Sequence, residues 1–189
     1  IDSHCHLHDP QWFNTEQQES FLCQAAEDGV KEIICVGTDP KDSMAACDFA
    51  AKHAGVYWTY GIHPEFADCY ARGESITPLL AREALSLSKD AVPRLPEKAS
   101  FIASRGIKNS PLLVAIGEIG LDYHYDGYDR TAQIRLFEQM LQLAKDLDLP
   151  VSLHIREAFA DAFAVLDNFS DMRGVVHSFT GSKKCLKQA

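Results

Sequence analysis

The strongest constraint on the fold is a repeated alternation of short apolar runs with longer amphipathic segments. The apolar runs are rich in Val, Ile and Leu, as strands buried on both faces of a parallel sheet are. We expect strands over 1–7, 32–36, 56–60, 112–116, 151–154 and 174–177, and helices over 16–28, 40–53, 74–88, 97–105, 131–147 and 158–168. This alternation predicts an α/β fold with a parallel sheet and right-handed crossovers.

Two closures of such a sheet compete, an open doubly wound sheet and a TIM (β/α)8-type barrel. The G-x-G-x-x-G signal of a dinucleotide-binding open sheet does not follow the first apolar run. Polar residues at the strand ends, described below, favour the barrel. Since no repeat or linker divides the sequence, we expect residues 1–189 to form a single barrel domain with only about six βα units, lacking the last two.

Composition limits the class of protein to which the chain belongs. The net charge of −9 argues against a broad basic surface that wraps nucleic acid. A polyanionic substrate stays open if metal ions supply positive charge locally. No stretch approaches about 18 uninterrupted apolar residues and no secretory signal is visible, so we expect no membrane partner. The 6 cysteines include no C-x-x-C pair, which predicts reduced thiols and a cytoplasmic location.

The segment His4-Cys5-His6 carries the strongest local signal of a metal site. Residues two apart in a strand face the same side, so His4 and His6 can bind one ion together. Cys5 then points the other way, as a small core residue would. The segment closes the first expected strand, at the carboxyl end where barrel active sites are built. For an isolated H-x-H pair, a satisfied polar cluster is the alternative.

Further polar residues occur beside the ends of later expected strands. They are His63 after the third strand, Glu118 after the fourth, His154 at the end of the fifth and His177 at the end of the sixth. Taken singly, each histidine could be a buried residue bonded to a backbone carbonyl. Recurrence at strand ends is harder to explain by packing, because every buried imidazole and carboxylate needs a partner. Divalent cations would provide that partner, so the pattern predicts a metal centre.

Glu118 has a special place in this pattern because it is a carboxylate among histidines. Its two oxygens can bridge two metal ions, as two-metal hydrolytic sites require. Gly117 and Gly120 would let backbone and ligand approach closely. A salt-bridged loop glutamate is the alternative. Asp122 either orients a ligand or caps the segment that follows it.

Arg156 points to a phosphate substrate. It lies two residues after His154 and therefore shares its face. A guanidinium suits a phosphate oxygen better than a neutral amide. An ion pair with Glu157 or Asp161 is the alternative for this residue.

Other residues near these strand ends have simpler explanations. We expect surface positions for His8, His53 and His124. Aromatic side chains in the strand-end loops could stack on a base, but ordinary packing explains each of them as well. These aromatic residues are Trp12, Tyr123 and Tyr125.

The chain resembles the TatD family of metal-dependent deoxyribonucleases in the motifs D-S-H-C-H-L, G-I-H-P, G-E-I-G-L-D-Y, L-H-I-R and H-S-F-T-G. The resemblance implies a TIM barrel and hydrolysis of DNA phosphodiester bonds, often from the 3′ end of single strands. A water activated by two divalent ions would attack the phosphorus. The family implies Mg2+, whereas an imidazole-rich site favours Zn2+ or Mn2+.

Carried over to this sequence, the resemblance implies metal ligands at His4, His6, Glu118, His154 and His177, with Glu118 bridging. It implies phosphate contacts at His63 and Arg156. Glu118 and His154 are the residues whose loss we expect to abolish catalysis. We expect a monomer that takes the ends of short or single-stranded DNA as its substrate.

One departure from the family pattern bears on the fold and the function. The family supplies an Asp at the end of its last strand, and residues 178–189 contain neither Asp nor Glu. Because six strands cannot close an eight-stranded barrel, we expect a protein about 60–80 residues longer. Two other functions stay open: an amidohydrolase acting on a small cyclic amide or ester, and a non-catalytic relative that binds metal or nucleic acid.

Overall fold

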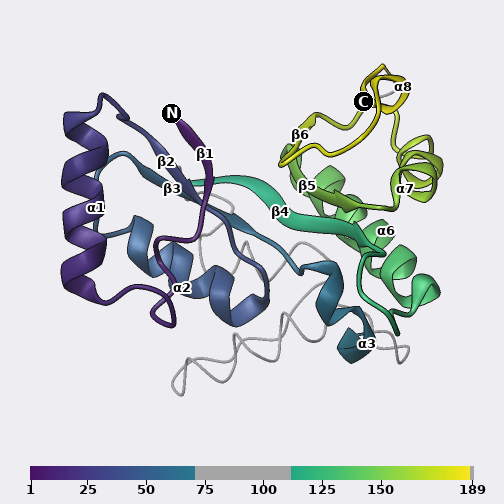
Figure 1. The fold of residues 1–189 in the computed structure, drawn as a ribbon, viewed down its shortest axis with the longest axis horizontal. Helices are drawn as coiled ribbons and strands as arrows, with labels where there is room; N and C mark the ends of the chain where they lie inside the picture. The colour runs from purple at the N-terminus through teal and green to yellow at the C-terminus, as the bar shows by residue number, and fades with distance from the viewer. Residues whose placement is uncertain (71–111, 188–189) are drawn as a thin grey trace.

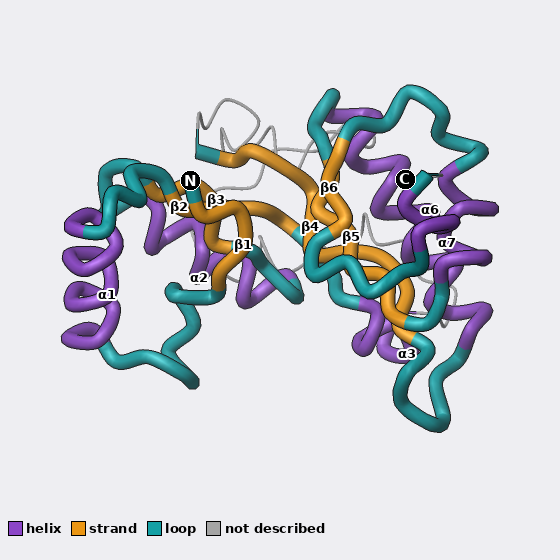
Figure 2. The backbone as a smooth tube through the Cα atoms, turned by 45° about the horizontal axis from the view of Figure 1, so that its top comes forward, coloured by secondary structure: helices purple, strands orange, loops and turns teal. Residues whose placement is uncertain are grey.

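The computed structural model describes residues 1–70 and 112–187, and its strands form one curved parallel sheet. The strands are β1 Asp2–Cys5, β2 Ile33–Cys35, β3 Val56–Tyr60, β4 Leu113–Asp122, β5 Val151–Arg156 and β6 Gly174–Val176. Their order in the sheet is β1-β2-β3-β4-β5-β6, the same as their order in the sequence. Figures 1 and 2 show the sheet curving as part of a barrel wall does. The α/β fold with a partial TIM barrel is confirmed.

Helices connect consecutive strands and flank the sheet. They are α1 Thr15–Glu27, α2 Pro40–Ala50, α3 Ala67–Tyr70, α6 Arg130–Leu147, α7 Phe159–Leu166 and α8 Lys183–Leu186, with a 3-10 helix η1 at Pro64–Phe66. Helices α2, α6 and α7 contact β3, β4 and β5, respectively. In Figure 1, α1 and α2 lie beside one half of the sheet, and α6 and α7 beside the other. The helices expected over 74–88 and 97–105 lie outside the described residues.

Side-chain caps explain where the main helices begin. Asn14 and Gln17 form a reciprocal capping box at the start of α1. Asp39 accepts a hydrogen bond from a backbone N–H of the first turn of α2, which begins with Pro40. Asp129 caps α6 in the same way.

Within the described ranges, no helix has both the length and the apolar character needed to cross a bilayer.

The hydrophobic core lies between the sheet and these helices. Helix α6 buries an apolar stripe at helical spacing, made of Leu136, Phe137, Met140, Leu141 and Ala144. The stripe belongs to the same core cluster as fully buried strand residues such as Trp58, Ile116 and Ile119. Burial of each large apolar side chain contributes about 1.5–3 kcal/mol. This packing holds the strands in fixed positions relative to the helices. It thereby also fixes the residues at the carboxyl ends of the strands.

Strand β4 is longer than its sequence pattern predicts. The expected strand ends at residue 116, but β4 continues to Asp122, so Glu118 lies within the strand and not after it. The two glycines that resemble strand breakers are sites of close approach. A Cβ at Gly120 would lie 1.9 Å from the carbonyl oxygen of His154, and one at Gly117 would also overlap the neighbouring strand. The glycines therefore bring β4 and β5 close together at the level of Glu118.

Candidate metal centre

The carboxylate of Glu118 is buried at the centre of a cluster of histidines. Glu118 is 4% exposed. Its Oε1 lies 2.6 Å from His177 Nε2 and 2.8 Å from His154 Nδ1. His63 Nε2 is 3.8 Å from the same oxygen. One carboxylate oxygen thus faces three imidazoles that come from separate βα units.

The other oxygen of Glu118 faces the first strand. Oε2 lies 3.5 Å from His4 Nε2 and 3.8 Å from His6 Nε2. The His4 ring stacks on the His177 ring, with centroids 3.9 Å apart and planes within 10° of parallel. Since β1 and β6 are the two outer strands of the described sheet, this stack joins its edges across the cluster.

The sheet brings together six of the seven residues that the sequence singles out. His4 lies in β1 and His6 directly follows it, Glu118 lies in β4, His154 lies in β5, and His177 directly follows β6. His63 caps η1 after β3, where its Nδ1 accepts a hydrogen bond from the Glu65 N–H. The five histidines stand at or near the carboxyl ends of parallel strands, which lie on one side of the sheet, and Glu118 within the longer β4 reaches them there. The seventh residue, Arg156, ends β5 and contacts Tyr125 instead of Glu118.

Burial and hydrogen bonding shift the pKa values of the carboxylate and the imidazoles in the cluster. Burial alone would raise the pKa of Glu118, but hydrogen bonds with His154, His177 and His4 outweigh it and hold that pKa well below its usual range. Burial lowers the pKa of His63 to about 4 and also lowers the pKa of His6. For His154 burial acts in the same direction, but its contacts with Glu118 and Asp122 outweigh it and raise its pKa. The ionised carboxylate and the neutral forms of His63 and His6 are the states that metal binding requires, whereas His154 must lose a proton to bind a metal.

The donor atoms fit divalent cations. His4, Glu118 and His177 form one group of possible ligands, and His63, Glu118 and His154 form a second. Within each group the ligand atoms lie within 4.8 Å of one another. Glu118 belongs to both groups, whereas His6 belongs to neither and lies at the rim. Imidazole nitrogens and carboxylate oxygens are common ligands of Zn2+ and Mn2+, so these residues can hold a divalent metal.

Hydrogen bonds connect His154 to Asp122, and Asp122 to Gln133. His154 Nε2 lies 3.0 Å from Asp122 Oδ2, and the other oxygen of Asp122 accepts the N–H of His124. Asp122 therefore does both things that its position suggested, since it orients a cluster residue and holds the following turn. The Gln133 side chain of α6 accepts the Asp122 N–H and donates to the Asp122 carbonyl, both at 2.8 Å. Gln133 is a functional residue that no motif identifies, because its sole sequence signal is its place among the apolar residues of α6.

Among the residues that the structure describes, none of the ion pairs involves Arg156. Its Nη1 lies 3.4 Å from the hydroxyl oxygen of Tyr125, and its Cζ lies 5.3 Å from the centre of that ring. The two carboxylates considered as alternatives bond elsewhere, Glu157 with His124 and Asp161 with Arg130. Toward the described residues, the guanidinium therefore keeps hydrogen-bonding capacity at the end of β5.

The surface position expected for His8 is wrong. His8 is 3% exposed, and its Nε2 lies 2.9 Å from Asp42 Oδ1. The other oxygen of Asp42 accepts the N–H of Thr38. The loop after β1 folds against the start of α2, where this carboxylate compensates the burial of the imidazole. His124 is exposed as expected, while His53 is half-buried. Cys5 packs against the core, as expected.

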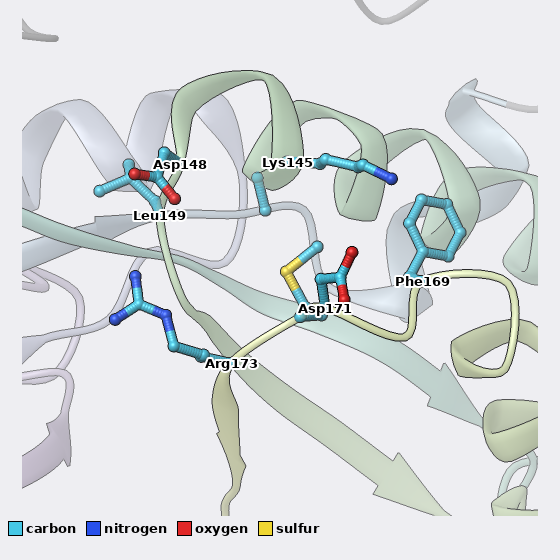
Figure 3. Close-up of a pocket in the computed structure, with 8 residues that line it drawn as sticks. Lys145, Asp148, Leu149, Phe169, Asp171 and Arg173 are labelled. Atoms are coloured by element: carbon cyan, nitrogen blue, oxygen red, sulfur yellow. The ribbon is translucent and has the colours of Figure 1, made fainter.

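The cavity drawn in Figure 3 lies away from this cluster. It has a volume of about 110 Å³ and is lined by the end of α6 and the segment before β6, including Lys145, Leu149 and Arg173. Since β5 and β6 begin there, the cavity marks the amino ends of the strands. The histidines stand at the carboxyl ends of the strands. The cavity in Figure 3 and the histidine cluster therefore lie at opposite ends of the strands.

Comparison with known proteins finds similar sequences that are named as nucleases. The chain is 31% identical over 169 residues to the 3′-5′ ssDNA/RNA exonuclease TatD of Cronobacter turicensis, covering 88% of this chain and 54% of that protein. It is 33% identical over 179 residues to the deoxyribonuclease Tat-D of Schizosaccharomyces pombe, covering 89% and 52%, respectively. The chain therefore spans about half the length of these relatives.

A structural relative agrees with this likeness. The crystal structure of YjjV, a TatD homologue from Escherichia coli K12, superimposes with a TM-score of 0.75 at 28% identity, covering 100% of this chain and 63% of that one. YjjV is described as an uncharacterized metal-dependent hydrolase. The family model for TatD related DNase matches residues 1–189. By this match over its full length, the chain belongs to the TatD related DNase family.

Proposed function

We propose that the whole protein is a metal-dependent deoxyribonuclease that hydrolyses phosphodiester bonds at the 3′ ends of single-stranded DNA. The observation that carries the proposal is the buried Glu118 carboxylate, shared by two groups of possible metal ligands. The names of the relatives, an exonuclease and a deoxyribonuclease, support the choice of a nucleic-acid substrate.

The proposed ligands of two divalent cations are His4, His6, Glu118, His154 and His177, with Glu118 shared. When bound, such ions lower the pKa of a coordinated water toward neutrality and offset charge on the phosphate. The resemblance favours Mg2+, and the imidazole-rich donor set favours Zn2+ or Mn2+. His63 stands in the second donor group, so a ligand role competes with its proposed phosphate contact.

Side chains of the protein would bind and orient the substrate. His63 and Arg156 would bind the non-bridging phosphate oxygens and orient the scissile bond. Arg156 is suited to this role because its guanidinium forms paired hydrogen bonds with phosphate. Asp122 is a positioning residue, since its hydrogen bond holds the His154 ring in one orientation. Glu118 and His154 are proposed as the catalytic residues because they lie 2.8 Å apart in one donor group, where the reacting phosphate would bind.

The test is digestion of an end-labelled oligonucleotide by the full-length protein, with added Mg2+, Mn2+ or Zn2+ and with EDTA. We expect metal-dependent shortening from the 3′ end. Glu118→Gln should lower the rate at least about a hundredfold and reduce metal binding measured by calorimetry. Glu19→Gln is the matched control, because Glu19 also bonds a histidine, His53, but on the surface.

Two results would contradict the proposal. One is full nuclease activity in both Glu118→Gln and His154→Ala. The other is turnover of a hydantoin-like cyclic amide by a protein that leaves every oligonucleotide intact, which would favour the amidohydrolase alternative.

A further inference from the structure

Tyr125 is an exposed aromatic ring in the loop that follows β4. It is 67% exposed. Its neighbours in the loop behave differently, because the Tyr123 and Tyr128 rings stack on each other, with centroids 4.6 Å apart and planes within 5° of parallel. The Tyr123 hydroxyl also donates to Asp161. Packing thus accounts for Tyr123, as expected for an ordinary aromatic residue, but it leaves the ring of Tyr125 largely exposed to solvent.

Two neighbours hold the Tyr125 ring in place. The guanidinium of Arg156 lies over it at 5.3 Å, a cation–π distance, and also reaches its hydroxyl. The His124 ring meets it edge-on at 4.9 Å, and Glu157 fixes His124 through a 2.8 Å contact. A ring held in this way loses little conformational entropy when a ligand stacks on it.

The paired ends of β4 and β5 connect Tyr125 with the metal centre. Gly120 is the register partner of His154, and Asp122 is the partner of Arg156. Arg156 therefore stands two residues beyond His154, about 6.6 Å along the strand. A phosphate bound by Arg156 near the cluster would place its own nucleoside beside the ring that the same guanidinium contacts.

On the basis of the proposed phosphodiesterase function, we propose that Tyr125 is a base-stacking subsite for the nucleotide whose phosphate Arg156 binds. Every base has a π face, so this subsite accepts any base and confers no sequence preference. Bases inside a duplex are already stacked on their neighbours. The subsite therefore selects single-stranded ends that carry a base.

The test measures binding of two fluorescein-labelled single-stranded oligonucleotides to the full-length protein in EDTA, which prevents turnover. One is oligothymidylate and the other has the same length with abasic tetrahydrofuran sugars. Tyr125→Ala should weaken binding of oligothymidylate about tenfold to a hundredfold, the range of one base–aromatic stack. Binding of the abasic strand should not change. Tyr125→Phe and Tyr125→Trp should restore the affinity for bases.

Tyr128→Ala is the matched control, because Tyr128 is a 41% exposed tyrosine of the same loop whose ring already stacks on Tyr123. An equal loss in Tyr128→Ala would indicate a loop effect and overturn the proposal. So would unchanged binding in Tyr125→Ala, equal losses on both strands, or no binding by the unmodified protein. A separate cleavage assay with metal distinguishes the two proposals: base-dependent binding without cleavage refutes the nuclease function alone, and cleavage with a silent Tyr125→Ala refutes the subsite alone.

Discussion

The close packing of Gly120 of β4 against His154 of β5 leads to a specific prediction for Gly120→Ala. The added Cβ would lie 1.9 Å from the His154 carbonyl oxygen, where ordinary contact begins at 3.4 Å, so the strands must separate by about 1.5 Å. The backbone φ of +145° adds strain for any residue with a Cβ. Strained backbone costs about 1–3 kcal/mol and overpacking about 1–3 kcal/mol. We therefore expect about 2–6 kcal/mol of destabilisation.

The same substitution should also weaken metal binding and catalysis, because it displaces the backbone that carries His154. A misplacement of about 1 Å can lower a rate a hundredfold. The measurements are chemical unfolding and metal titration calorimetry on the full-length protein. Gly29→Ala is the control: its φ is +84°, but nothing lies within 4 Å of the added Cβ, so it should lose only about 1 kcal/mol and keep its metal affinity. Equal destabilisation of the two variants, with unchanged metal affinity in Gly120→Ala, would refute the reasoning.

Three further predictions concern pH, metal removal and the support of His154. Although burial raises it, the pKa of Asp42 lies below its ordinary 3.8 because of hydrogen bonds with His8 and Thr38. Its stabilising contribution is thus present above that value and lost as pH falls through the folded-state pKa, so Asp42→Asn should flatten the acid side of a pH series of unfolding free energies. EDTA should lower the melting temperature of the unmodified protein but not that of Glu118→Gln, as calorimetry would show. Asp122→Asn should weaken metal affinity about 10- to 100-fold, with little change in melting temperature; an unchanged titration would contradict this.

The order of the strands and the strand-end histidines follow from local patterns. Buried parallel strands produce continuous apolar runs, and parallel strands place their carboxyl ends at one edge, so His63, His154 and His177 could be expected to lie together. The extent of β4 could not be predicted, because Gly117 and Gly120 have the local character of a turn. Their fit against β5 is visible only when both strands are present.

Long-range partners were equally hidden from the sequence. His8 follows a strand in a polar loop, and nothing near it indicates that Asp42, on another element, would bury it. Gln133 has a helix-forming side chain whose role depends entirely on where α6 crosses the end of β4. In both cases the contact joins residues that no periodicity relates.

The paired hydrogen bonds between Gln133 and Asp122 have a consequence for the outer helix layer. The uncharged side-chain amide of Gln133 on α6 bonds both the backbone N–H and the carbonyl of Asp122, the residue that orients His154. A slight rotation of that helix, caused by a distant repacking, would be transmitted as a tilt of the imidazole. Substitutions that repack α6, far from any ion, would therefore change the metal affinity of the site.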